Sequence, residues 1–217
     1  MIPYIIHQIY WDLGNGNIEY NDIFYNSHQL FKSIDGFKYK LWDKSSCDNL
    51  IQTKFSALAY NFYMNLRYDI QRIDFARMCI LYEYGGIYFD LDMIPIREFD
   101  NLLNRDFLFH NIRYIRPNYS YIENDIMGSV KHHPFWLELI DYCQKEYNIK
   151  SQMNIYNVWK GRFVLQTTGP KLLSRFIKKH YSYIKPMKLV YTKWNRDTMK
   201  GYYFKDLKLN MWVNTIN

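Results

Sequence analysis

Two carboxylates separated by one residue, Asp90 and Asp92, are the side chains of this sequence best suited to chemistry. They lie in the segment 87–92, which is otherwise apolar and follows a pair of glycines. If this segment is a strand, Tyr88, Asp90 and Asp92 share one face, and the two carboxylates lie about 7 Å apart. Such carboxylates repel each other unless a cation or a donor-rich ligand lies between them, which indicates a divalent metal. Solvated strand ends also carry this pattern, so the pair alone leaves a structural reading open.

A helix is predicted immediately upstream, over residues 69–84, where apolar side chains recur at helical spacing. Asp69 is the candidate N-cap, and the glycine pair supplies the C-terminal stop. Asp74 and Arg77 lie three positions apart and therefore on the same side of this helix. They form either a surface ion pair, which contributes a few tenths of a kcal/mol, or part of the site. Open α/β sheets bind ligands beyond the carboxyl ends of their strands, which favours a single site beside strand 87–92.

These motifs together resemble the core signature of DXD-type glycosyltransferases of family 32. That family includes initiating mannosyltransferases of the yeast type, capsular sugar transferases and, more distantly, the glucosylating domains of large clostridial toxins. The core signature reads Asp74-x-x-Arg77 followed by Gly85-Gly86-Ile87-Tyr88-x-Asp90-x-Asp92. Flanking segments from residue 2 to about residue 212 are also similar to the family: the opening segment 2–10, Asn124-Asp125-Ile126-Met127-Gly128 with His133-Pro134, and Thr168-Gly169-Pro170.

The resemblance implies an α/β fold of GT-A type, in which helices flank a Rossmann-like central mixed sheet. The length of 217 residues suits one catalytic domain over residues 1–217. The implied reaction is retaining transfer of a sugar from a nucleotide-sugar donor to a glycan, protein or lipid-linked acceptor. A UDP-sugar is slightly favoured as donor over GDP-mannose.

The resemblance also assigns roles to the core residues. Mn²⁺ or Mg²⁺ would neutralise the charge that develops on the departing diphosphate. Asp92 is the first-choice metal ligand, and Asp90 would contact the ribose or the donor sugar, with a water-mediated bond to the metal. Tyr88 would contact the nucleoside, while Asp74 and Arg77 would bind hydroxyls of the transferred sugar.

Further site residues are expected outside the core. Tyr10 would stack on the base, where relatives usually have Trp. In the tail, Asn210 would complete the metal shell and Trp212 would donate its indole N–H to a phosphate oxygen, unless the tail is a frayed end. Asn124 or Asp125 would lie near the anomeric carbon, where an Asp could capture an oxocarbenium-like intermediate and an Asn could only stabilise it. Either residue could instead be a turn former before a helix.

Composition excludes little and points to no second function. The net charge of +7, from 28 basic and 21 acidic residues, suits an anionic ligand, and no nucleic-acid-binding motif accompanies it. The basic stretch around Lys178 and Lys179 is read as a solvated face, with weak docking on an anionic membrane as the alternative. A basic nucleic-acid-binding module is one rival. A HAD-type phosphatase is the other, but that class expects Thr or Val where Ile94 stands.

The cellular location expected from the sequence is the cytoplasm, or the host cytoplasm if the source is viral. No run of about 18 apolar residues is present, and the N-terminus lacks a signal-peptide pattern. The three cysteines are widely spaced and without a metal-ligand pattern, so they are expected to be reduced. His7 and His133 are expected to bind backbone groups rather than act as bases.

The remaining elements are predicted from hydrophobic pattern and punctuation. Strands are expected at 2–11, 38–42, 106–110 and 188–192, helices at 54–66, 134–146 and 170–180, and a loop over the tail 195–217.

Overall fold

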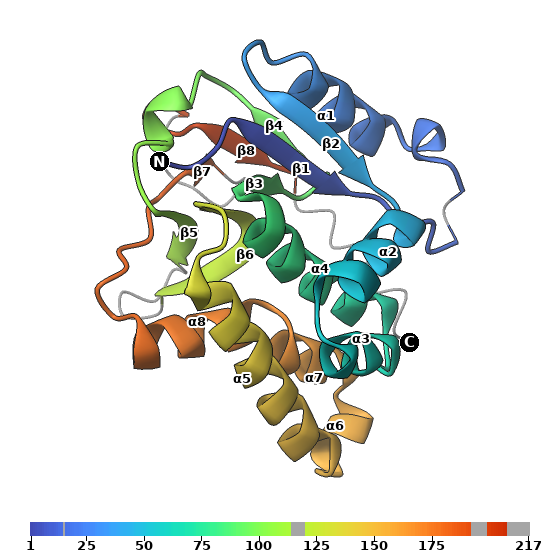
Figure 1. Ribbon diagram of the computed structural model, residues 1–217. Coiled ribbons are helices and arrows are strands. Elements are labelled where there is room, and N and C mark those ends of the chain that lie inside the picture. The colour runs from blue at the N-terminus through green and yellow to red at the C-terminus, as the bar shows by residue number, and fades with distance from the viewer. Residues whose placement is uncertain (15, 114–119, 192–198, 208–217) are drawn as a thin grey trace.

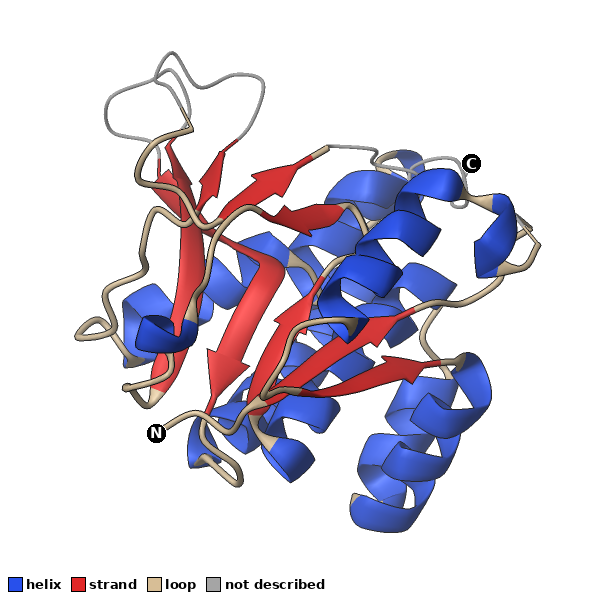
Figure 2. Cartoon of the chain, turned by 90° about the horizontal axis from the view of Figure 1, so that it is seen from above, coloured by secondary structure: helices blue, strands red, loops and turns tan. Residues whose placement is uncertain are grey.

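The computed structural model describes residues 1–14, 16–113, 120–191 and 199–207 (Figures 1 and 2). Its strands are β1 (Ile5–Ile9), β2 (Lys38–Trp42), β3 (Gly86–Phe89), β4 (Met93–Pro95), β5 (Phe107–Arg113), β6 (Ser120–Ser129), β7 (Val190–Tyr191) and β8 (Phe204–Asp206). Its helices are α1 (Asp22–Lys32), α2 (Lys44–Lys54), α3 (Ala57–Met64), α4 (Asp69–Tyr84), α5 (Pro134–Ser151), α6 (Ile155–Val158), α7 (Lys160–Thr167) and α8 (Pro170–His180), with short 3-10 turns at Ile18–Tyr20 and Asp100–Leu102.

The described strands form two sheets. The central sheet has five strands in the order β2-β1-β3-β6-β5, in which β1 is parallel to β2 and β3, whereas β6 is antiparallel to both β3 and β5. A smaller sheet has the order β4-β8-β7. This is the mixed α/β architecture that the sequence predicts.

The central sheet carries a hydrophobic core on each face. Tyr88 and Met127 belong to the core shared with α2, α3, α4, α5 and α8. Ile87 and Phe89 point the other way, and Phe89 stacks on Phe31 of α1 with ring centroids 4.4 Å apart. In Figure 1, α1 and the smaller sheet accordingly lie on one side of the central sheet, and the larger group of helices lies on the other. Period-two alternation therefore holds within β3, but both of its faces are buried.

Two glycines join α4 to β3. Gly85 ends the helix with φ of +64°, and Gly86 has φ of +88°. A Cβ atom at Gly86 would lie 2.5 Å from the carbonyl oxygen of Ile5 in the neighbouring strand. Glycine is required here because β1 and β3 approach closely at a backbone conformation that other residues rarely adopt.

For three predicted elements, the structure confirms both the type and the first and last residues. The ranges 38–42, 69–84 and 170–180 are β2, α4 and α8. Strands expected at 2–11, 106–110 and 188–192 are β1, β5 and β7 with shifted ends, the helix expected at 134–146 extends to Ser151, and that expected at 54–66 is α3. The N-cap of α4 is Tyr68 rather than Asp69, which is the first helical residue.

Two predictions are wrong, and several elements were not predicted, among them β6 and α7. The strand expected over 87–92 ends at Phe89, and the chain then turns into β4 of the smaller sheet. Part of the tail expected to be a loop is β8, which pairs with β4 and β7. The helices α1 and α2 were not predicted, although Asn21 and Asp43 cap them by accepting hydrogen bonds from the backbone N–H groups of Phe24 and Ser46. That the chain is one domain stays a prediction.

Candidate active site

Asp74 and Arg77 lie in the middle of α4, on its buried side. Their exposed fractions are 4% and 5%, and an Arg77 Nη1 to Asp74 Oδ1 distance of 3.2 Å makes them an ion pair. The surface-pair reading is therefore wrong. A buried pair of this kind is costly to desolvate and needs further hydrogen bonds to both partners.

Asp74 has such partners on both carboxylate oxygens. The Asn124 Nδ2 group donates to Oδ1 at 2.8 Å, and the Thr168 hydroxyl donates to Oδ2 at 2.9 Å. Burial raises the pKa of Asp74 to about 6, although Arg77 and these two donors favour the ionised form. The carboxylate is thus held in one orientation by β6 and by the residue that follows α7.

Arg77 joins Asp74 to the first carboxylate of the Asp-x-Asp motif. Its Nη2 lies 2.8 Å from Asp90 Oδ1, and the hydroxyl of Tyr88 donates to the same oxygen at 2.6 Å. The guanidinium also lies over the Tyr88 ring, 4.8 Å from its centroid. Burial raises the pKa of Asp90, and Arg77 opposes that shift. Five of the residues predicted for the site therefore form one connected cluster, which also includes Thr168: Asp74, Arg77, Tyr88, Asp90 and Asn124.

Asp92 lies beyond the end of the strand rather than on its face. A turn closes where the Met93 backbone N–H donates to the Asp90 carbonyl oxygen at 3.1 Å. Asp92 lies within this turn and is partly exposed, and its carbonyl oxygen accepts a hydrogen bond from the Leu207 N–H at 3.1 Å. Its side chain is therefore presented by a turn, which corrects the expectation of two carboxylates on one strand face.

Asn124 and Asp125 lie within β6, so the reading of either as a turn former before a helix is wrong. The Asn124 carbonyl oxygen accepts from Arg77 Nη1 at 3.1 Å. The Asp125 carbonyl oxygen accepts from the Asp90 backbone N–H at 2.8 Å. Strand pairing thus brings both residues to the cluster.

The donor set suits a hard divalent cation, because it consists of carboxylate oxygens. Within the described ranges, no three His, Cys, Asp or Glu side chains gather closely enough to enclose a metal ion. Mg²⁺ is commonly held by one or two carboxylates together with the phosphates of its substrate. Asp92 fits that mode better than Asp90, because Asp90 Oδ1 already binds Arg77 and Tyr88.

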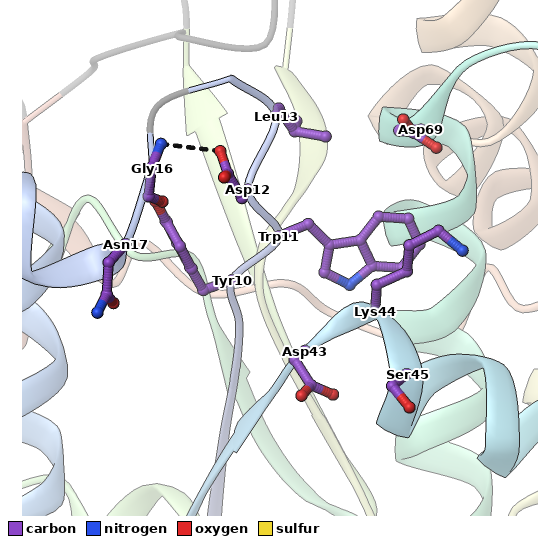
Figure 3. A pocket seen from close by; sticks show the side chains of 10 residues that line it. All are labelled: Tyr10, Trp11, Asp12, Leu13, Gly16, Asn17, Asp43, Lys44, Ser45 and Asp69. Atoms are coloured by element: carbon purple, nitrogen blue, oxygen red, sulfur yellow. Dashed lines mark hydrogen bonds between the residues drawn. The ribbon is translucent and has the colours of Figure 1, made fainter.

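A cavity of about 460 Å³ opens beyond the carboxyl ends of β1 and β2. Tyr10 and Trp11 line it together with Lys44 of α2 and Asp69 of α4 (Figure 3). The Tyr10 hydroxyl donates to the carbonyl oxygen of Gly16, another lining residue, at 2.6 Å, which holds the Tyr10 ring at the wall of the cavity. Asp69, which lines the cavity, is the first residue of α4. The cavity therefore lies at the N-terminal end of this helix.

The two histidines bind backbone groups, as expected. His7 donates from Nε2 to the Gly85 carbonyl oxygen at 2.9 Å and accepts the Trp42 indole N–H on Nδ1. Burial lowers its pKa to about 4, so it is neutral. His133 caps α5 by accepting the Phe135 N–H on Nδ1.

Sequence reasoning missed one member of the cluster and left two of its candidates untested. Thr168 was noted only as part of a motif, and its contact with Asp74 spans 94 positions along the chain. Asn210 and Trp212 lie outside the described residues. The described chain ends at Leu207, in contact with the Asp92 turn.

Comparisons with known proteins agree with this geometry. The family profile described as "Glycosyltransferase sugar-binding region containing DXD motif" matches residues 22–108. An uncharacterized glycosyltransferase of Acanthamoeba polyphaga mimivirus is 31% identical over 83% of this chain and 66% of its own length. A mannosyl phosphorylinositol ceramide synthase of Saccharomyces cerevisiae is 32% identical over 83% of this chain and 43% of its own. The solved structure of the PaToxG glycosyltransferase superposes with a TM-score of 0.60 at 17% identity, over 83% of this chain and 70% of that one.

Fold and profile together define a glycosyltransferase of GT-A type. The chain belongs to the family of DXD-containing glycosyltransferases, family 32. It spans less than half the length of the budding-yeast relative. The phosphatase and nucleic-acid-binding readings are disfavoured by the same findings.

None of the helices in the described ranges combines the length and the apolar character needed to cross a membrane.

Proposed function

We propose that the chain is a metal-dependent, retaining glycosyltransferase domain that moves a sugar from a nucleotide-sugar donor to an acceptor. The observation that carries this proposal is the buried pair of Asp74 and Arg77, joined to the partly exposed Asp90, next to the turn that presents Asp92. A carboxylate and a guanidinium held rigidly side by side can bind the hydroxyls of one sugar ring. The adjacent and more exposed carboxylate of Asp92 can hold a cation that binds the diphosphate.

In this proposal, Asp74 and Arg77 fix the transferred sugar. Asn124 and Thr168 hold the Asp74 carboxylate, and Asp90 and Tyr88 hold the guanidinium, so neither group has to reorganise when the donor binds. Tyr88 is 1% exposed, which favours this supporting role over direct contact with the nucleoside.

Asp92 would hold Mn²⁺ or Mg²⁺ together with the donor's phosphates. When bound, the cation would neutralise the charge that develops on the leaving diphosphate. Asn210 and Trp212 stay proposed contributors to the same end of the donor. Asn124 and Asp125 are proposed near the anomeric carbon because both adjoin the cluster.

The cavity beside Tyr10 is proposed for the nucleoside. Aromatic faces suit a planar base. The lining also holds the carboxylates Asp12, Asp43 and Asp69 and the basic residue Lys44, whose Nζ pairs with Asp48 at 2.7 Å. The sequence favours a UDP-sugar. Fungal relatives named as inositol phosphoceramide mannosyltransferases make GDP-mannose the main competitor and a lipid-linked glycan a candidate acceptor. Glycan and protein acceptors, a cytoplasmic location and weak docking of basic surfaces on anionic membranes complete the proposal.

Thermal unfolding with nucleotides tests it. UDP or GDP with Mn²⁺ should raise Tm by several degrees, because a ligand bound only to the native state stabilises it by mass action. Either component alone should do much less. Asp141→Asn, which alters an exposed carboxylate on α5, is the matched control for Asp92→Asn and should keep the full shift. An equal shift in the presence of EDTA would contradict the metal-dependent site.

A further inference from the structure

A chain of directed hydrogen bonds runs from α1 and β2 to the turn that carries Asp92. Gln8 of β1 and Ser27 of α1 are both fully buried. The Gln8 Nε2 group donates to Ser27 Oγ at 3.1 Å, and Ser27 Oγ donates to the Met93 carbonyl oxygen at 2.7 Å. A second, longer bond of 3.4 Å runs from Gln8 Nε2 to the Asp90 carbonyl oxygen.

In this series of hydrogen bonds, the donor and acceptor of each bond follow from which of the partner atoms carry a proton. Tyr39 donates its hydroxyl to Gln8 Oε1 at 2.8 Å, so its oxygen accepts from His28 Nδ1, 2.7 Å away. The carboxamide of Gln8 is therefore oriented with its oxygen toward Tyr39 and its nitrogen toward the turn. Ser27 Oγ therefore accepts from Gln8 and donates its own proton to the Met93 carbonyl oxygen, which can only accept.

The turn itself is held from four separate segments of the chain. On the β6 side, the Asp90 backbone N–H donates to the Asp125 carbonyl oxygen at 2.8 Å. Gln8 and Ser27 bind the carbonyl oxygens of Asp90 and Met93, and the Leu207 N–H binds the carbonyl oxygen of Asp92. The turn contributes one bond of its own, from the Met93 N–H to the Asp90 carbonyl oxygen. A short turn with one internal bond has many accessible conformations, so these outside contacts set the place of the Asp92 side chain.

We propose that Gln8 and Ser27 are positioning residues for the Asp92 turn, and that they set the affinity for the divalent cation rather than the recognition of the sugar. The cation part rests on the proposed function, whereas the positioning of the turn does not. Groups that orient a metal ligand without touching the metal commonly change its affinity by 10–100-fold when they are removed.

Ser27→Ala is the direct test, and Ser129→Ala is its matched control. Both serines are fully buried, and each accepts one side-chain N–H and donates to one backbone carbonyl oxygen, since Ser129 lies between the Trp136 indole and Val130. Ser129 pairs with Gly86, at the opposite end of β3 from the site. Tyr39→Phe is the second variant, because it removes the orienting bond to Gln8 without touching the turn.

The first readout is amide hydrogen exchange at Met93 and Leu207, without any ligand. Ser27→Ala should speed this exchange about tenfold relative to both wild type and Ser129→Ala, and Tyr39→Phe should change it in the same direction by less. Equal exchange in Ser27→Ala and Ser129→Ala would overturn the proposal.

The second readout is the Kd of Mn²⁺ for the protein saturated with UDP or GDP, measured by the paramagnetic signal of free Mn²⁺. Ser27→Ala should weaken Mn²⁺ binding by 10–100-fold, with the Kd of Ser129→Ala unchanged. Faster exchange with unchanged Mn²⁺ affinity would overturn the link to the cation. If wild type itself binds no Mn²⁺ with either nucleotide, the proposed metal-dependent function fails, and the exchange result still decides the positioning role.

Discussion

Asp74 is a buried carboxylate whose pKa lies at about 6, above the ordinary 3.8, because burial disfavours its charge. The native state therefore holds this proton more tightly than the unfolded chain does. Asp74 favours the folded state below pH 4, and that contribution is lost as the pH rises through about 6. The same titration governs the proposed sugar clamp in the opposite sense, because only the ionised carboxylate pairs fully with Arg77.

We expect the raised pKa of Asp74 to be visible in the pH dependence of the free energy of unfolding. The free energy of unfolding of wild type relative to Asp74→Asn should fall between pH 4 and pH 6 and be constant above pH 7. Urea unfolding at half-unit pH intervals measures it. A difference between the two proteins that does not change with pH would show that Asp74 titrates normally.

Asp90 and Asp92 should respond differently to the same substitution. Asp90→Asn leaves the buried guanidinium of Arg77 with a weaker partner and should cost about 1–3 kcal/mol of stability. Asp92→Asn should leave Tm within a degree or two and abolish the Mn²⁺-dependent binding of donor. Near-normal turnover in Asp92→Asn but not in Asp90→Asn would reverse the roles assigned to them.

At the junction between α4 and β3, the close approach of β3 to β1 requires that residue 86 has no Cβ atom. Gly86→Ala must strain a backbone at φ of +88° and place a Cβ atom 2.5 Å from the Ile5 carbonyl oxygen. Gly36→Ala has the same kind of backbone, with φ of +80° and no atom within 4 Å of the new Cβ. The control should cost about 1–2 kcal/mol, and Gly86→Ala should cost a few kcal/mol more. Equal losses in urea unfolding would mean that β1 and β3 can separate without cost.

Some helix ends carry local glycine or proline signals and could be predicted from the sequence, although the locally capped helices α1 and α2 were missed. Ends that are set by distant contacts could not be predicted. The glycine pair after α4 and Pro170 at the start of α8 mark those ends within a few residues. In contrast, the alternation over 87–92 suggests one long strand, because nothing local shows that Ser27 and Leu207 hold a turn at 90–93. The site divides in the same way. Spacing placed Asp74, Arg77 and Asp90 in one helix-to-strand unit, and the resemblance to family 32 gave them roles in the site. The Thr168 contact with Asp74 depends on tertiary structure and leaves no such signal.

At the scale of the whole molecule, the fold places the cluster and the cavity at the same edge of the central sheet. Helix α4 links them, because Asp69 lines the cavity and Asp74 lies in the cluster. The net charge of +7 of the whole chain favours anionic ligands in general, and a nucleotide-sugar carries two phosphates. A donor that spans from the cavity to the cluster would have its diphosphate between its base and its sugar, and we propose that the Asp92 turn binds it there.

Hydrolysis of the donor in the absence of acceptor is the measurement that tests the central claim most directly. A panel of UDP-sugars and GDP-mannose would be incubated with the protein and Mn²⁺, and the released sugar would be followed by proton NMR. We expect release from one donor, with the α-anomer appearing first, no release in EDTA, and loss of release in Asp92→Asn but not in Asp141→Asn. Release that proceeds equally in EDTA or in Asp92→Asn, or no release from any donor of the panel, would contradict it.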